Sequence, residues 1–346
     1  MSRVQELARW LPDERTAALI TSPVSLRFLC GGEIHEGIAL VFRENSFLFV
    51  PESDLRQLPK TEGFTVRSAE STNLLDLLVK YGIKKLFTES DKMTVAQLNA
   101  FKEQLYYAEF ITDNRLPRQL LMMRMVKTET ELAAVKKAAR ICDRAYERTL
   151  GALRSGMTER QAAAMLNLRM GELGADEPAF PTVVLSGENT SNLRLRPSDR
   201  RFSPGDFVLI EFGARYRGYC ASMSRTVAVG EISPAMDNVY NAVACAVTDG
   251  LRAIREGVGG NVPDSVAKST LNAWRVSGSS DFGHGTGLDF SEPPYPGQGF
   301  MLKRNMTLNA GIYVGGRFGV KISDTAIVTE NGSEDLMNSA KSLIHI

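Results

Sequence analysis

Histidine is scarce in this chain, and its cysteines form no metal-binding pattern. Only three histidines occur among the 346 residues, so a mechanism that needs two neighbouring imidazoles has little to draw on. The four cysteines include no CxxC pair. Their scatter predicts neither a zinc ribbon nor a disulfide framework, and we expect reduced, mostly buried thiols.

Long apolar runs are also lacking, and the formal net charge is only +1. No uninterrupted apolar run approaches the roughly 20 residues of a membrane helix, and the start, MSRVQELARWLPDER, is charged where a signal peptide is apolar. Forty-one basic and 40 acidic residues nearly cancel, so no overall field attracts nucleic acid or anionic lipid. We therefore expect a cytoplasmic protein that binds neither nucleic acid nor membranes. Its partner, a small molecule or a short peptide, would be selected by a local site.

The pattern of apolar residues divides the chain into residues 1–122 and 123–346. The first part alternates short apolar runs such as GIALVF with helical patterns such as TNLLDLLVKYGI, which is typical of a small α/β domain with a mixed sheet. The segment RQLLMMRMV is the expected hinge between the two domains.

Helices and strands of the second part follow one another in a definite order. Two amphipathic helices come first, KTETELAAVKKAARICDRAYERTLGAL with Thr128 or Thr130 as its cap, and TERQAAAMLNLRMGELG with Thr158 as its cap. The strand patterns FPTVVLSG, DFVLIEFGARYRGYCAS and SRTVAVG follow, then the helix SPAMDNVYNAVACAVTDGLRAI, then GHGTGLDFS, MTLNAGIYVGG and VKISDTAIVTENG. This order predicts an α+β domain, an antiparallel sheet with helices on one face.

Several long motifs of the second part carry a family resemblance. KTETELAAVKKAAR, AFPTVVLSGEN, PGDFVLIEFGARYRGYCASMSRTVAVG, FGHGTGLDFSEPP, AGIY and VKISDTAIVTENG occur in the order of the landmarks of the pita-bread metallopeptidases. That family includes prolidase, Xaa-Pro aminopeptidase, methionine aminopeptidase and the metal-free amidinohydrolase creatinase. The resemblance implies a pita-bread domain over 123–346, a creatinase-like domain over 1–122, and a homodimer.

The resemblance also implies a site for two divalent metal ions, held by two aspartates, one histidine and two glutamates. His284 matches the histidine of the GHG motif, and Glu211, in IEFG, stands where the first aspartate is expected. Neutral residues fill the other three carboxylate positions. They are Ser222 in ASMSRT, Asn309 in LNAGIY and Ser323 in VKISDT, where the family has a VRIEDT-like run.

Two substrate-side histidine positions of the family are changed as well. Ser291 stands seven residues after His284, and Arg194, in LRLRP, aligns with the other histidine. With one carboxylate and one imidazole remaining, a pair of divalent ions would be poorly neutralised in a partly dry cleft. We therefore expect no metal cofactor.

Two classes of function remain open for a cleft without metals. One is a non-peptidase that binds a peptide or small molecule, with Arg194 meeting a carboxylate and Glu211 and His284 as polar anchors. The other is a metal-free hydrolase like creatinase, in which Glu211 and His284 form an acid/base pair. A residual Xaa-Pro metallopeptidase is a further alternative. The other residues expected in the cleft are Ser222, Ser291, Asn309 and Ser323.

Overall fold

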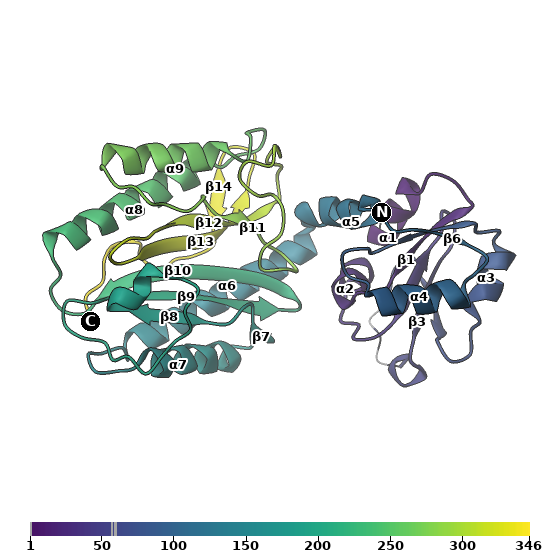
Figure 1. The fold of residues 1–346 in the computed structure, drawn as a ribbon, viewed down its shortest axis with the longest axis horizontal. Helices are drawn as coiled ribbons and strands as arrows, with labels where there is room; N and C mark the ends of the chain where they lie inside the picture. Colours follow the sequence, from purple (N-terminus) through teal and green to yellow (C-terminus); the bar gives the residue numbers. More distant parts are fainter. Residues whose placement is uncertain (1, 57, 59–60) are drawn as a thin grey trace. The chain divides into compact units, whose positions relative to one another are not determined.

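The computed structural model describes residues 2–56, 58 and 61–346, and the chain divides into two compact units. Unit 1 is Met1–Arg124 and unit 2 is Met125–Ile346. Each unit combines helices with its own sheet (Figure 1). In the part of the chain that is described, none of the helices has the length and apolar character that a membrane crossing requires.

Unit 1 is built on a six-stranded sheet in the order β4-β3-β2-β1-β5-β6. Because β1 pairs antiparallel with β2 and parallel with β5, the sheet is mixed, as predicted. The strands are β1 (Thr16–Ile20), β2 (Ile38–Val41), β3 (Ser46–Val50), β4 (Thr65–Ser68), β5 (Lys85–Thr88) and β6 (Glu109–Ile111). The helices are α1 (Arg3–Trp10), α2 (Pro23–Cys30), α3 (Leu74–Lys80), α4 (Val95–Gln104) and α5 (Arg115–Met125), with a 3-10 turn η1 (Glu52–Asp54). The segment RQLLMMRMV, expected as a hinge, lies almost entirely within α5.

Unit 2 contains an eight-stranded antiparallel sheet in the order β11-β12-β13-β10-β9-β7, with β14 beside β13 and β8 beside β9. Its strands are β7 (Glu177–Pro178), β8 (Val183–Ser186), β9 (Phe207–Tyr216), β10 (Tyr219–Ala228), β11 (His284–Gly285), β12 (Thr307–Val314), β13 (Val320–Val328) and β14 (Ser333–Asp335). Its helices are α6 (Glu129–Leu150), α7 (Glu159–Glu172), α8 (Pro234–Ala253) and α9 (Val262–Ala273), with a 3-10 turn η2 (Gly187–Ser191). This is the predicted α+β arrangement.

Capping boxes begin the first two helices of unit 2. The Thr128 hydroxyl accepts a hydrogen bond from the backbone N–H of Glu131, whose carboxylate accepts one from the Thr128 N–H. Thr158 and Gln161 form the same reciprocal pair at α7. Of the two predicted caps of α6, Thr128 is therefore the correct one.

Two details of the predicted second unit were wrong. The stretch DFVLIEFGARYRGYCAS is two strands, β9 and β10, joined by a tight turn at Arg217 and Gly218. Both turn residues have positive φ, 48° and 81°, as a two-residue hairpin turn requires. The helix α9 was also missed, although Asn261 and Pro263 at its start are typical of a helix N-terminus.

The helices of unit 2 pack on one face of its sheet. Apolar residues of β9 and β10, such as Ile210, share a core with α6 and α7. Apolar residues of β12 and β13, such as Ile312 and Ile322, share another with α8 and α9. Since successive side chains of a strand point to opposite faces, Glu211 and Ser323 face away from these helices.

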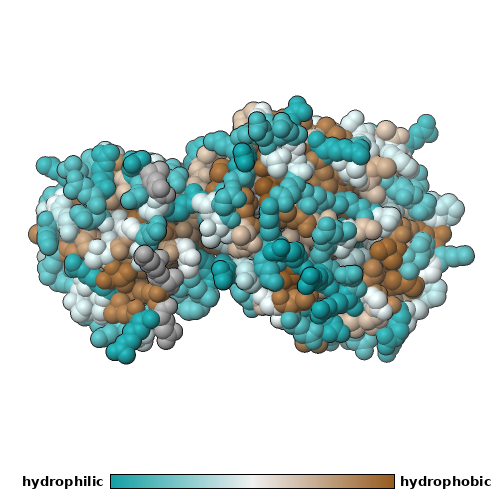
Figure 2. Space-filling model, turned by 180° about the vertical axis from the view of Figure 1, so that it is seen from behind, coloured by the Kyte–Doolittle hydropathy of each residue, from teal (hydrophilic) through white to brown (hydrophobic). Residues whose placement is uncertain are grey.

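Hydrophilic residues cover much of the molecular face shown in Figure 2, and hydrophobic residues gather there in several separate areas. Such a mixture is usual for the surface of a globular protein. The polar residues on the helix-free face of the unit 2 sheet are a more specific feature of this chain than its surface.

Candidate functional site

Five strands of unit 2 bring the five expected metal-ligand positions to one sheet face. We call these residues the polar cluster: Glu211 of β9, Ser222 of β10, His284 of β11, Asn309 of β12 and Ser323 of β13. All but His284 are buried, with exposed fractions of 9% or less.

The strand registers show why the polar cluster shares a face. His284 lies opposite Asn309, and Gly311, two residues further along β12, lies opposite Ser323. Ser224, two residues after Ser222, lies opposite both Glu211 and Ser323. Directly opposed residues of an antiparallel pair point to the same side, as do residues two apart in one strand.

Glu211 is already paired with a cation of the same chain. Its Oε1 accepts a hydrogen bond from the Nζ of Lys321, and both side chains are mostly buried. Lys321 precedes Ser323 by two residues and therefore shares its face of β13. Lys321 was not among the residues expected in the cleft, although its spacing from Ser323 in VKISDT indicates that both share a face.

The neutral members of the polar cluster are partly satisfied by their neighbours. The Ser323 hydroxyl donates to the Ser224 hydroxyl at 2.9 Å, and the Ser222 N–H donates to the Thr325 hydroxyl at 2.9 Å. Among the described residues, however, the Ser222 Oγ and Asn309 Oδ1 are buried without a hydrogen-bond partner. These two oxygens leave hydrogen-bonding capacity unused at the site.

His284 is held in one orientation and one tautomer. Its Nδ1 lies 2.8 Å from the Gly285 carbonyl, which can only accept, so Nδ1 carries the proton. The ring meets Phe290 edge to face at 4.9 Å between centroids. Burial lowers the pKa of His284, and the charge of Lys321 lowers it further, whereas Glu211 and Glu292 oppose that shift.

The lowered pKa of His284 predicts a pH dependence of stability. Because the unfolded chain takes up a proton near pH 6.5 while the folded site stays neutral, stability is retained above about pH 6.5 and lost as the pH falls below it. We expect His284→Gln to lessen the fall in the free energy of unfolding between about pH 7.5 and about pH 5. Urea titrations would follow Trp274 fluorescence in a Trp10→Phe background, where Trp274, in unit 2, is the remaining tryptophan.

The exposed His345 of unit 2 provides the matched control. A His345→Gln variant shows how the same measurement responds to loss of an imidazole outside the polar cluster, since the His345 ring contacts the Gly230 carbonyl. If His284→Gln and the parent lose the same stability on acidification, the burial of His284 does not govern the response.

Glu211 and His284, the predicted acid/base pair, have other hydrogen-bond partners in the structure. Oε1 of Glu211 is bound by Lys321, and Nδ1 of His284 faces a backbone carbonyl. In the part of the chain that is described, no hydrogen bond joins the two side chains. Their pairing stays a prediction.

Ser291 and Arg194 are not gathered into the polar cluster. Both are exposed, and the backbone N–H of Arg194 donates to Asn192 Oδ1 at 3.0 Å. Within the described residues, neither side chain forms a hydrogen bond or ion pair with the polar cluster. Their roles in ligand binding stay predictions.

A buried ion pair fixes the segment that follows His284. Lys127 Nζ lies 3.0 Å from Glu292 Oε1, with 1% and 2% of the two side chains exposed. The Glu292 N–H also donates to the Gly285 carbonyl at 3.0 Å. The segment 292–294, with the sequence EPP, is thus anchored to the start of unit 2. Through Glu292 it also positions the Gly285 carbonyl, to which His284 binds.

The donors of the polar cluster do not match a two-metal site. The described residues include no group of three or more His, Cys, Asp or Glu side chains placed to hold a metal ion. The cluster offers one imidazole and one carboxylate, which already neutralises Lys321. Serine and asparagine oxygens are neutral, so this donor set does not fit two divalent ions with a total charge of +4.

Two family models match this chain. The model of metallopeptidase family M24 matches residues 133–330, and the creatinase/prolidase N-terminal domain matches residues 3–126. The first match covers the polar cluster completely.

Solved structures and curated proteins with similar chains agree with these matches. The X-Pro aminopeptidase of Thermotoga maritima is 27% identical, with a TM-score of 0.89 and 100% of both chains covered. The Xaa-Pro dipeptidase of Bacillus anthracis is 28% identical, with a TM-score of 0.91, covering 99% of this chain and 98% of that one. An uncharacterized peptidase of Bacillus subtilis is 29% identical over 344 residues, with 94% of each chain covered.

Proposed function

The chain belongs to metallopeptidase family M24, and from this premise we propose that its dinuclear metal site is lost and that it binds a peptide or small molecule without hydrolysing it. Solved structures similar to it include an X-Pro aminopeptidase and an Xaa-Pro dipeptidase. The proposed ligand site is the polar cluster together with the predicted cleft residues Arg194 and Ser291.

The observation that carries the proposal is that Ser222, Asn309 and Ser323 bring neutral oxygens to three of the five ligand positions. Glu211, the remaining carboxylate, is paired with Lys321. One carboxylate is balanced by one ammonium group, and His284, whose pKa is lowered by burial, adds no charge near neutral pH. A divalent ion placed here would have too few anions to neutralise it, because one carboxylate stands where the family has four.

The polar cluster retains groups suited to holding a peptide or another amide-rich molecule. Asn309 Oδ1 accepts a hydrogen bond, and the Ser222 hydroxyl donates or accepts one. Arg194 remains the proposed anchor for a ligand carboxylate. We also propose a homodimer in the cytoplasm, by likeness to the family layout and from the balanced charge of the chain.

A metal-free hydrolase is the less favoured proposal. It needs a base next to an acid, whereas Glu211 faces Lys321 and His284 faces Gly285. Binding a ligand without hydrolysing it does not require Glu211 and His284 to contact each other.

Metal analysis and a peptidase assay test the proposal directly. Protein purified without chelator should contain far less than one equivalent of Mn, Zn, Co or Fe by plasma mass spectrometry. It should leave Xaa-Pro dipeptides and tripeptides uncleaved when Mn²⁺ or Co²⁺ is added. An active Xaa-Pro aminopeptidase, purified and assayed in parallel, is the control.

Two results would contradict the proposal in different ways. Nearly two equivalents of metal together with turnover would show a working metallopeptidase. Cleavage of a peptide or guanidino compound in the presence of chelator would favour the metal-free hydrolase, whereas recovery of a bound compound unchanged would favour the binding protein.

A further inference from the structure

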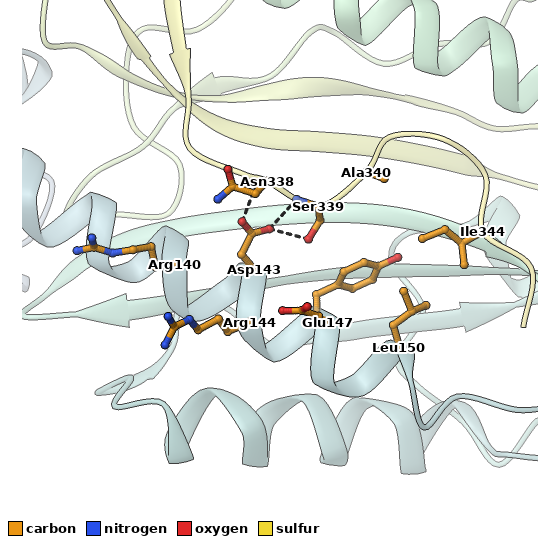
Figure 3. Close-up of a pocket in the computed structure, with 10 residues that line it drawn as sticks. Arg140, Asp143, Arg144, Glu147, Leu150, Asn338, Ser339, Ala340 and Ile344 are labelled. Carbon is orange, nitrogen blue, oxygen red and sulfur yellow. Dashed lines mark hydrogen bonds between the residues drawn. The ribbon is translucent and has the colours of Figure 1, made fainter.

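A pocket of about 440 Å³ lies on the other side of the unit 2 sheet from the polar cluster, between α6 and the C-terminal segment. Asp143 of α6 ties this segment down, since its carboxylate accepts hydrogen bonds from the N–H groups of Asn338 and Ser339 and from the Ser339 hydroxyl, at 2.6–3.0 Å (Figure 3). The pocket is therefore a formed feature of the fold. Its volume lies within the usual range for small-molecule sites, about 300–1,000 Å³.

The phenol group of Tyr146 lines this pocket and leaves its hydroxyl unused. Only 2% of the residue is exposed, and within the described residues its Oη has no hydrogen-bond partner. Burial raises the pKa of Tyr146 to about 12, so the hydroxyl keeps its proton. A buried hydroxyl without a partner costs stability, which is expected where a group serves a ligand and not the fold.

The rest of the lining has a charged end and an apolar end. Arg140 and Arg144, one helical turn apart on α6, lie at one end of the view in Figure 3, and Leu150 and Ile344 lie at the other. Neither arginine forms an ion pair in the part of the chain that is described. Glu147 also lines the pocket and is exposed.

We propose that this pocket is a second small-molecule site, which takes a carboxylic acid with an apolar body. The two guanidinium groups bind the carboxylate, and Leu150 and Ile344 cover the apolar body. The Tyr146 hydroxyl, whose oxygen is covered in the free protein, donates to a second polar atom of the ligand once side chains of the pocket move aside for it. The site acts independently of the polar cluster, so it stands or falls apart from the function proposed above.

The test compares 3-(4-hydroxyphenyl)propionate, whose phenol oxygen is the polar atom for Tyr146, with its neutral amide by isothermal titration calorimetry on the full chain. The acid should bind at least about tenfold more tightly than the amide, because the arginines form charge-assisted bonds only with the acid. Replacing Arg140 and Arg144 together by alanine should weaken binding of the acid about 10–100-fold. No measurable binding of the acid, or equal binding of acid and amide, would overturn the proposal.

Tyr146→Phe separates a ligand-binding role from a structural one, and Tyr240→Phe is its matched control. Tyr240 is as deeply buried, but its hydroxyl donates to the Lys341 carbonyl at 3.1 Å. Tyr240→Phe should lower Tm by about 2–4 °C and keep the affinity for the acid. Tyr146→Phe should keep or raise Tm and weaken the acid about 3–10-fold. A loss of Tm in Tyr146→Phe equal to that in Tyr240→Phe, or an unchanged affinity, would show that the hydroxyl does not serve a ligand.

Discussion

Restoring the four carboxylate positions together is expected to raise the metal content of the chain from far below one to about two divalent ions. The substitutions are Glu211→Asp, Ser222→Asp, Asn309→Glu and Ser323→Glu. Each replaced side chain is buried on the sheet face that His284 also occupies. Four carboxylates and an imidazole would supply the negative charge that two divalent ions need, which the natural residues do not.

The fourfold variant should also make the stability of unit 2 depend on metal. Without metal, four carboxylates crowd one buried face and repel one another, so the free energy of unfolding falls below that of the natural chain. Adding Mn²⁺ at about 100 times its dissociation constant should return about 2.7 kcal/mol for each metal site that is filled. Urea titrations of Trp274 fluorescence in the Trp10→Phe background, with and without Mn²⁺, measure both effects.

A threefold variant that keeps Ser323 is the matched control. Ser323 stands at the position of the glutamate that bridges both ions in the family, so its retention should prevent occupancy by two metals. A folded fourfold variant that binds no metal would show that the cluster geometry itself has changed. A Mn²⁺-dependent shift in the natural chain would contradict the proposed loss of the site.

The periodicity of apolar residues and the positions of capping residues predicted much of this fold. Thr128 and Thr158 begin helices because their hydroxyls satisfy backbone N–H groups, which depends on residues only three positions away. The alternation of β9 and β13 likewise predicts which side chains share a face. Such local rules place the members of the polar cluster once the order of strands is known from the resemblance.

Contacts between distant strands were harder to predict. Lys321 and Glu211 are 110 residues apart in the chain and meet only through the register of β9, β10 and β13. Arg194 lies in an irregular segment after η2, where no periodicity indicates the direction of a side chain. Local sequence therefore could identify the candidate residues but not the cation that neutralises the remaining carboxylate.

A second long-range contact lies beside the polar cluster, on the helix-covered side of β13. Arg225 Nη1 is 2.7 Å from Asp324 Oδ1, with 1% and 0% of the two side chains exposed. Lys341 Nζ lies 2.5 Å from the other oxygen of Asp324. Arg225 Nη1 also donates to the carbonyls of Ser224 and Ser323 at 2.9 and 3.1 Å, so it joins β10 to β13 directly behind the cluster.

Replacing Asp324 by asparagine is expected to lower the free energy of unfolding of unit 2 by about 3–5 kcal/mol. Asparagine keeps the shape of the side chain but removes its charge, so Arg225 remains buried without a counter-ion. Replacing both partners, by Arg225→Met and Asp324→Leu, should cost much less than the sum of the two single changes, because no charge is then left unpaired. The same Trp274 urea titration measures all three variants.

The exposed pair Arg169–Glu172 on α7 calibrates this measurement. Its side chains are 36% and 42% exposed, and its nitrogen and oxygen lie 2.8 Å apart, close to the distance in the buried pair. Glu172→Gln should change the free energy of unfolding by less than about 0.5 kcal/mol, because water solvates and screens both charges. If Asp324→Asn costs no more than Glu172→Gln, burial does not set the strength of the Arg225–Asp324 pair. The register of β10 and β13 is then held by their other bonds, such as those of Ser323 to Ser224 and of Ser222 to Thr325.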